Sequence, residues 1–465
     1  MQLSQGQQKA CEFITDFLLN KHQPHDIIIP RFQGDEDPMV FNSNQVMVLS
    51  GAAGTGKTTV IKYVLEHLEK VQKTMEALGI KVQRNPRVEF TATTNKAAEA
   101  FEHAMGCSAK TIHSLLRLGM EEDPVTYKDV LVSHKPLELL FGTYVFVDEA
   151  SYIDMTLLEH IYMKLGNGTK VIFMGDKAQC KTAEGDLPVF EEGRFPMVEL
   201  TQIMRQADDN PVQALSKRLR QWVLEGGPTP PCNVDGKNII WVERSKFEAG
   251  MIRDMSRDEW EYSTSKFLAF TNKRVNEVNH KIYSQVTGSQ TLREGDYAIC
   301  NSYVGGIKNV LPAIGTDRLV YLTGLEPGKQ LGEEGHWVYT DRNRKGSKDF
   351  KSGEVVQAYF MPNDKKAKDK LLRRFSKKLQ EMVFAENPEE FTKIKNALDK
   401  VKNTWIDLRP VFGCTIHKAQ GSTFRRVYVD LGDLNRCRDI DQLRRLVYVA
   451  ISRARLQVVL TGDIP

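Results

Sequence analysis

Short apolar runs alternate with helical patterns between residues 45 and 204 of this 465-residue chain. Unbroken apolar strands separated by helices are typical of a parallel sheet that helices cover on both faces. A second set of such runs follows later in the chain, so we predict two α/β lobes. The first set lies at 45–49, 88–91, 144–147 and 171–174, and the second at 267–271, 427–431 and 458–460.

Two segments near the start of the chain depart from this alternation. Residues 3–20 place apolar side chains on one face of a helix. Residues 21–44 contain three prolines and an acidic cluster, which predict a long irregular excursion.

Residues 288–410 interrupt the second lobe with a pattern of their own. Short β-like runs with glycine turns fill 290–360, and two amphipathic helical patterns follow. The second begins at Asn387-Pro388-Glu389-Glu390, where a cap, a first-turn proline and an acidic third residue signal a helix start. We predict a small β-module that carries a helical hairpin. Its basic stretch 365–378 is either a solvated helix face or a contact for nucleic-acid phosphate.

Composition narrows the class of protein. Hydrophobic residues make up 41% of the chain, enough for sizeable cores, and the net charge of +4 favours a polyanionic partner only weakly. The seven cysteines are odd in number and none forms a C-x-x-C pair, which argues against a disulfide framework or a zinc site. There is no signal-peptide pattern and no long apolar run. We therefore expect a cytoplasmic protein without a membrane segment.

The segment GAAGTGKTT, residues 51–59, lies between a predicted strand and a predicted helix. In the spacing G-x-x-x-x-G-K-T, backbone N–H groups and a helix N-terminus surround phosphate oxygens. Lys57 then reaches the β- and γ-phosphates, and Thr58 ligates Mg²⁺. The alternative is a glycine-rich turn without a ligand. We predict a site for ATP and Mg²⁺, and the loop residues around the phosphates are Ala53, Gly54, Thr55, Gly56 and Thr59.

Two carboxylates end another predicted strand, in Val145-Phe146-Val147-Asp148-Glu149. Beside a phosphate-binding loop, Asp148 is placed to hold Mg²⁺ directly or through water. Glu149 is placed to orient and deprotonate an attacking water. A small-molecule kinase does not need the second carboxylate, whereas a hydrolase does. The pair therefore predicts nucleotide hydrolysis.

Three further polar residues complete the predicted hydrolytic set. Gln179 follows a third apolar strand and is placed to sense the γ-phosphate or position water. Arg205 and Arg453 supply the kind of charge that stabilises a transferring phosphoryl group. Because Arg453 lies in the second predicted lobe, its approach would couple nucleotide state to the angle between the lobes.

The order of these motifs resembles that of superfamily 1 helicases of the RecD-like, 5′-to-3′ branch, in particular the Dda helicases of tailed phages. The resemblance covers nearly the whole chain apart from the insertion. The insertion corresponds to the family's SH3-like module and tower, and DPVTYKDVLV (123–132) to its strand-separating hairpin. The motifs are LSQGQQKA, GAAGTGKTT, TATTNKAAE, KTIHSLL, VFVDEAS, GDKAQ, ELTQIMR, FTNKRVNEVN, CTIHKAQGST and LVYVAISRAR.

The resemblance implies roles that the residues alone do not. It assigns adenine contact to Gln7, which is also the third helical residue of a capping box begun by Ser4. It places Gly421 beside the nucleotide. Eight residues would bind single-stranded DNA, mostly at phosphate or sugar, which suits tracking without sequence preference. They are Thr93, Asn95, Thr111, His113, Lys273, Thr415, His417 and Lys418, of which the two histidines also fit a structural role.

The implied fold class is α/β, with two RecA-like P-loop lobes that contain parallel sheets. A small β-hairpin is inserted in lobe one, and an SH3-like β-module with a helical-hairpin tower is inserted in lobe two. The predicted boundaries are 1–116 and 137–204 for lobe one, 117–136 for the hairpin, 205–287 and 411–465 for lobe two, and 288–410 for the module and tower.

The sequence thus predicts an ATP- and Mg²⁺-dependent DNA helicase that moves 5′-to-3′ and unwinds duplex. We expect a monomer that serves phage replication or recombination in the host cytoplasm. Its partners would be single-stranded DNA, duplex forks and single-strand-binding or recombination proteins. Two rivals stay open: a translocase that strips proteins or prefers RNA, and an ATP-gated single-strand-binding protein with little turnover. Glu149 and Arg453 argue against the second rival, and the strand-binding motifs argue against a nucleotide kinase.

Overall fold

The structure is a computed structural model that packs as two compact units. The first unit comprises Met1–Glu121, Leu131–Glu243 and Ala419–Pro465, and the second Glu122–Val130 and Arg244–Lys418. The description covers residues 3–20, 23–31, 37–79, 86–122, 129–133, 138–182, 185–202, 210–308, 310–341, 358–382 and 388–463.

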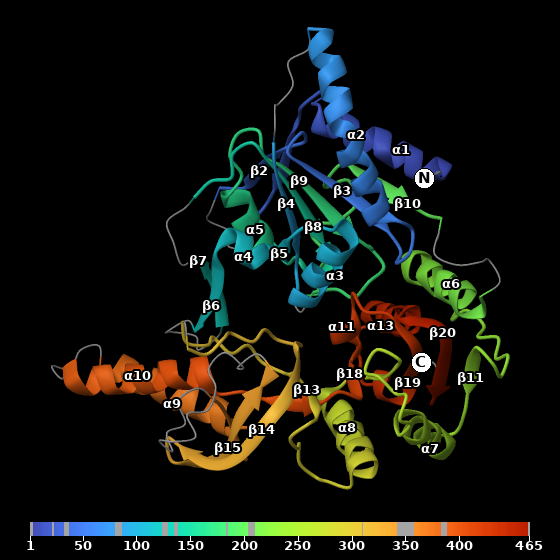
Figure 1. Ribbon diagram of the computed structural model, residues 1–465. Helices are drawn as coiled ribbons and strands as arrows, with labels where there is room; N and C mark the ends of the chain where they lie inside the picture. The colour runs from blue at the N-terminus through green and yellow to red at the C-terminus, as the bar shows by residue number, and fades with distance from the viewer. Residues whose placement is uncertain are drawn as a thin grey trace. The chain divides into compact units, whose positions relative to one another are not determined.

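A six-stranded parallel sheet forms the centre of the first unit (Figure 1). All five neighbouring pairs run parallel, so the carboxyl ends of the strands meet at one edge. The predicted first α/β lobe is confirmed. In spatial order the strands are β10 (Met197–Leu200), β3 (Val46–Gly51), β9 (Lys170–Gly175), β8 (Thr143–Asp148), β4 (Arg87–Ala92) and β5 (Ala109–Thr111).

Helices bury both faces of this sheet. Alternate residues of one strand enter different cores: Val46 and Val48 join one cluster, and Met47 and Leu49 the other. Both faces are therefore apolar, which is why the strands appear in the sequence as unbroken runs. One cluster is covered by α1 (Gln5–Leu18), α2 (Lys57–Ala77) and α3 (Asn95–Met105), the other by α4 (Ile112–Leu116) and α5 (Met155–Met163).

The segment expected to be a long irregular excursion contains paired strands. β1 (Asp26–Ile29) and β2 (Met39–Asn42) form an antiparallel pair. Ile29, Met39 and Phe41 are buried in the core that α5 covers, so this hairpin closes one face of the unit. The expectation failed because three prolines and an acidic cluster interrupt 21–44, and each strand is only four residues long.

Two further groups of strands lie outside the six-stranded sheet. β6 (Leu118–Glu122) and β7 (Asp129–Ser133) form a two-stranded sheet where the small hairpin was predicted, and residues 123–128 between them lie outside the described residues. The pairs β11–β20 and β19–β20 are parallel. The first unit also contains α6 (Pro211–Glu225), β11 (Ile239–Trp241), β19 (Phe424–Asp430), α12 (Leu431–Leu434), α13 (Ile440–Ser452) and β20 (Ala454–Thr461).

The second unit combines a parallel strand pair with an antiparallel module. β12 (Ser265–Ala269) pairs in parallel with β18 (Gly413–Thr415), beside α7 (Arg244–Met255) and α8 (Asn272–Thr287). The antiparallel sheet has the order β16-β15-β14-β13-β17. Its strands are β13 (Tyr297–Cys300), β14 (Leu319–Gln330), β15 (Glu333–Thr340), β16 (Tyr359–Pro362) and β17 (Leu408–Pro410), and the short helix α11 is Ile416–Ala419.

The predicted helical hairpin is α9 (Ala367–Glu381) and α10 (Pro388–Thr404). Leu371 and Phe375 of α9 pack with Ile394 and Leu398 of α10 in one core that also contains Trp405. The predicted fold class is confirmed: parallel α/β sheets with a small β-hairpin, an antiparallel β-module and a helical hairpin. The predicted domain boundaries remain a prediction. Among the described helices, none combines the length and apolarity needed to cross a bilayer.

Lys170, the first residue of β9, ties three segments of the first unit together. Its buried ammonium donates to the carbonyl oxygens of Phe17 (2.6 Å) and Asn44 (2.7 Å) and to Oδ1 of Asn20 (2.7 Å). Removing one partner of a buried charged network leaves the others unsatisfied, at a cost of several kcal/mol.

We expect Lys170→Met to lower the free energy of unfolding by about 3 kcal/mol, because three acceptors lose their donor. Urea denaturation measures this loss. Lys70→Met, at an exposed position on α2, is the matched control and is expected to change stability by less than about 0.5 kcal/mol. A Lys170→Met protein as stable as the control would contradict this role.

Candidate nucleotide-hydrolysis site

The loop between β3 and α2 has the backbone of a phosphate cradle. Gly54 and Gly56 have φ values of +86° and +87°, which favour glycine. A Cβ on Gly56 would lie 2.4 Å from Nε2 of Gln7, so a larger residue would displace the Gln7 amide. No side chain caps the N-terminus of α2, and its first N–H groups are free to bind an anion.

Lys57 and Gln7 both turn toward this loop. The Lys57 ammonium donates to the carbonyl oxygens of Gly51 (2.6 Å) and Ala52 (3.3 Å). Gln7 completes the capping box with Ser4, and its Nε2 also donates to the carbonyl oxygen of Thr55 at 3.1 Å. Gln7 therefore holds the loop through its amide, and the adenine contact remains a prediction.

Asp148 is the last residue of β8, Glu149 follows it, and both line the same cavity as the loop. Oδ1 of Asp148 accepts from the N–H of Glu149 at 2.9 Å. Glu149 has a φ of +53°, which a residue with a side chain rarely adopts and which is often found at functional sites. Its Oε2 is buried and makes no hydrogen bond in the described structure. Burial and, next, the Asp148 carboxylate raise the pKa of Glu149 to about 7.

Gln179 sits within a chain of buried hydrogen bonds. Its Oε1 accepts from Oγ of Ser151 and from Nε2 of Gln420, each at 3.1 Å. The neighbouring Gly421 lies so near Glu149 that a Cβ there would be 3.4 Å from Oε1. Sequence reasoning missed Ser151 and Gln420, although both lie inside quoted motifs. The signal that could have found them is that both are polar and lie within two positions of an assigned residue, Glu149 or Gly421.

Asp176, at the end of β9, anchors a second buried network. It accepts from Nε of Arg220 at 3.0 Å and from the hydroxyl of Tyr448 at 2.6 Å. Burial opposes the ionised form, but the Arg220 guanidinium and the Tyr448 hydroxyl outweigh it and lower the pKa of Asp176. Sequence reasoning did not assign these three residues.

α13 holds the strand-end loop that carries Gln179. Nη1 of Arg445 donates to the carbonyl oxygens of Lys177 (2.6 Å) and Gln179 (2.9 Å). Arg453, which follows α13, is buried and donates to the carbonyl oxygens of Val449 and Ser422. These contacts fix the backbone of Gln179 and the side chain of Arg453.

One cavity of about 470 Å³ in the first unit collects most of the predicted nucleotide residues. The predicted residues that line it are Gln7, Ala53, Gly54, Gly56, Lys57, Thr58, Thr59, Asp148, Glu149, Gln179, Gly421 and Arg453. Thr55 is buried and hydrogen-bonds within the loop. Arg205 lies outside the described residues.

The donor set of this cavity fits Mg²⁺. Thr58 and Asp148 supply a hydroxyl and a carboxylate to one space, and Mg²⁺ prefers oxygen ligands, with few from the protein and the rest from phosphates and water. Burial raises the pKa of Asp148 despite the nearby Lys57 ammonium, so a bound cation would favour its ionised form. Within the described residues, no cluster of three or more His, Cys, Asp or Glu offers a metal cage.

The predicted DNA-binding residues fall in both units. In the first, Thr93 donates to the carbonyl oxygen of Glu149 at 3.0 Å, Asn95 is exposed, and Thr111 caps α4. His113 is half-buried, and burial lowers its pKa. Thr93 therefore links the segment after β4 to the backbone of Glu149.

In the second unit the predicted DNA-binding residues differ in accessibility. Lys273 is exposed, whereas Thr415 is buried, and burial lowers the pKa of His417. The Lys418 ammonium lies 2.8 Å from Oδ1 of Asp317 and 3.2 Å from Oδ1 of Asn301. Sequence reasoning missed this ion pair, because Asp317 lies about 100 residues away in the chain.

The pKa of Glu149 leads to a pH prediction. Only the ionised carboxylate accepts a proton, and the folded-state pKa is raised to about 7. ATP turnover at saturating substrate is therefore expected to rise with pH between about 6 and 8 and then level off. Steady-state phosphate release across this range measures the profile. A flat or falling rate over that interval would contradict Glu149 as the base.

Comparisons with known proteins match this chain along most of its length. A family described as "AAA domain" matches residues 38–223, and one described as "UvrD-like helicase C-terminal domain" matches residues 410–461. The "ATP-dependent DNA helicase dda" of Enterobacteria phage T4 is 23% identical over 454 residues, covering 89% of this chain and 93% of that protein.

Two other similarities are weaker, one in the length that it covers and the other in sequence identity. The "ATP-dependent RecD2 DNA helicase" of Deinococcus radiodurans is 30% identical over 170 residues, which are 36% of this chain and only 21% of that protein. A solved Pif1 helicase from Bacteroides, in complex with ADP-AlF3 and single-stranded DNA, is 17% identical with a TM-score of 0.48. That alignment covers 100% of this chain and 93% of the Bacteroides chain.

Proposed function

We propose that this chain, which resembles the superfamily 1B (RecD-like) helicases and among them the Dda type, is an ATP-driven DNA helicase. One observation carries the proposal: Lys57, Glu149 and Arg453 line the same cavity, beside a phosphate-type loop. A site that only binds nucleotide needs the first of these. A site that hydrolyses it uses all three.

Each residue has a defined part in hydrolysis. The loop N–H groups and the Lys57 ammonium bind the phosphates, and the buried Glu149 carboxylate takes a proton from the attacking water. Gln179 orients that water or the γ-phosphate through the amide that Ser151 and Gln420 fix. The Arg453 guanidinium stabilises charge that develops on the transferring phosphoryl group. Thr58 and Asp148 would hold Mg²⁺, which would neutralise phosphate charge when bound.

A hydrogen bond to the backbone of Glu149 couples hydrolysis to DNA binding in this proposal. Thr93, a predicted strand-binding residue, donates to the carbonyl oxygen of Glu149, the proposed base. A strand held at Thr93 would therefore bear on the position of that base. The 5′-to-3′ direction and a role in phage replication or recombination are part of the proposal and rest on the resemblance to Dda-type helicases.

Strand displacement tests this function against its rivals. We expect ATP-dependent separation of a duplex with a 5′ single-stranded tail, and little separation of one with only a 3′ tail. Separation of the 3′-tailed duplex alone would reverse the direction. Release of a bound protein without separation of either duplex would favour the stripping translocase, and stronger activity on RNA tails would favour the RNA rival.

A further inference from the structure

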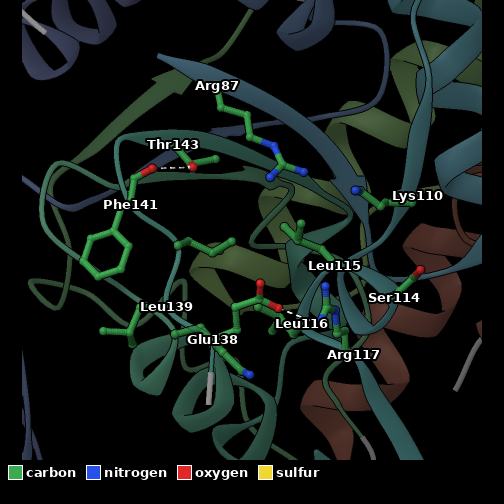
Figure 2. Close-up of a pocket in the computed structure, with 12 residues that line it drawn as sticks. Arg87, Lys110, Ser114, Leu115, Leu116, Arg117, Glu138, Leu139, Phe141 and Thr143 are labelled. Carbon is green, nitrogen blue, oxygen red and sulfur yellow. Dashed lines mark hydrogen bonds and ion pairs between the residues drawn. The ribbon is translucent and has the colours of Figure 1, made fainter. Parts of the chain in front are cut away.

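A second cavity of about 280 Å³ lies in the first unit, away from the nucleotide site (Figure 2). It adjoins the starts of β4 and β8, at Arg87 and Thr143. Thr143 and Asp148 are at opposite ends of β8, so the two cavities are about 16 Å apart along that strand. They share no lining residue. Lys110 and Ser114 line it, whereas the predicted DNA-binding residues Thr111 and His113 do not.

Cations outnumber anions around this pocket. Figure 2 shows Arg87 and Lys110 reaching in from neighbouring strands, and Arg117 paired with Glu138. Arg87 and Lys110 share one carboxylate, that of Glu89. With Lys164, the lining contains four cations and one carboxylate, that of Glu138, and Glu89 outside the lining supplies a second.

Lys164 is the residue that indicates a ligand. It is only 4% exposed and lines the cavity, and within the described part of the chain its ammonium makes no hydrogen bond or ion pair. The ammonium is not among the fully buried polar atoms without a partner, so it opens onto the solvent space of the cavity. An anion that enters the cavity would supply the missing partner.

Three leucines, which we call the leucine floor, form an apolar part of a pocket whose lining also includes polar and charged side chains. Leu115, Leu116 and Leu140 line the floor, and leucine side chains offer no hydrogen bonds to the polar edge of a nucleobase. Phe141 is 61% exposed, yet its carbonyl oxygen accepts from Oγ1 of Thr143 at 2.9 Å. A Cβ on Gly166 would lie 2.7 Å from the Phe141 ring, so the loop is tightly packed. An exposed aromatic side chain on a rigid rim is typical of a protein interface.

We propose that this pocket binds an acidic segment of a partner protein. An apolar side chain of that segment occupies the leucine floor and packs on Phe141, and a neighbouring carboxylate pairs with Lys164. This goes beyond the proposed helicase activity and does not depend on ATP chemistry. Positive charge beside an apolar floor favours a peptide over a nucleic-acid strand, which would present phosphates to an open surface.

Fluorescence anisotropy with the full chain tests the proposal. The probe is a short fluorescein-labelled peptide in which Asp and Glu flank a single Phe. The wild type is expected to bind it, and to bind at least about tenfold more weakly when Ser replaces the Phe or when Asn and Gln replace the acids. Added salt should weaken binding, since charge pairs contribute.

Two protein variants separate the two halves of the pocket. Lys164→Met keeps the bulk of the side chain but removes the charge, and Phe141→Ser removes the exposed ring. Each is expected to weaken peptide binding at least about tenfold, whereas Lys70→Met is not. Thermal unfolding checks that each variant folds. If Lys164→Met does not fold, Phe141→Ser still tests the proposal, because Phe141 is exposed.

DNA-stimulated ATP turnover should stay within about twofold of wild type in both variants, because neither residue lines the nucleotide cavity. Wild type that does not bind the peptide, or variants that bind it equally well, would overturn the proposal. Displacement of the peptide by a single-stranded oligonucleotide, with matching loss of DNA binding in Lys164→Met, would assign the pocket to nucleic acid instead.

Discussion

Glu149→Gln is expected to bind ATP with near-normal affinity and to hydrolyse it about 10³-fold more slowly. The amide retains the size of the buried side chain but does not accept a proton at neutral pH, and general bases typically contribute factors of 10² to 10⁴. Phosphate release measures the rate, and a fluorescent ATP analogue measures binding.

Two further variants serve as controls for the effect of Glu149→Gln. Glu66→Gln, an exposed change on α2, should hydrolyse ATP at the wild-type rate. Lys57→Ala should lose turnover and weaken phosphate binding together, because it removes positive charge from the loop. Hydrolysis by Glu149→Gln at the wild-type rate would mean that another group activates the water.

Arg453→Lys is expected to lower DNA-stimulated kcat by about 10³ while it changes ATP affinity much less. An arginine that stabilises a phosphoryl transition state is worth factors of 10³ to 10⁵, and lysine does not reproduce its forked donor geometry. Lysine keeps the positive charge in this buried site, so the change tests geometry more than charge. Phosphate release and nucleotide binding on the same protein separate the two effects.

The matched control is Arg436→Lys, since this side chain is 64% exposed and pairs with Asp433 outside the nucleotide cavity. It should leave both measurements unchanged. A parallel fall in affinity and rate for Arg453→Lys would instead place Arg453 among residues that merely hold the nucleotide. Thermal unfolding of both variants excludes loss of the fold as the cause.

The sequence predicted those parts of the fold that depend on a local pattern of residues. Strands β3, β8 and β9 are buried on both faces and therefore appear as unbroken apolar runs. The start of α10 at Pro388 follows from its local cap signal, and the loop before Lys57 follows from glycine spacing. Because parallel strands end at one edge, adjacent motifs at strand ends imply a common site.

The features that the sequence did not predict depend mainly on contacts between residues that are far apart in the chain. The ion pair of Lys418 with Asp317, and the three acceptors around Lys170, join segments far apart in the chain. The β1–β2 pair was missed because two four-residue strands in a proline-rich segment carry little periodic signal. The pocket beside Lys164 was missed because its cations come from separate elements and form no run.

We expect the nucleotide cavity to hydrolyse ATP in response to a bound DNA strand. The most direct measurement is the rate of phosphate release by the wild type at saturating ATP and Mg²⁺, with and without single-stranded DNA. We predict a rate at least about tenfold higher with DNA, because the strand helps to align the base and the arginine. Equal rates in the presence and absence of DNA would contradict the account.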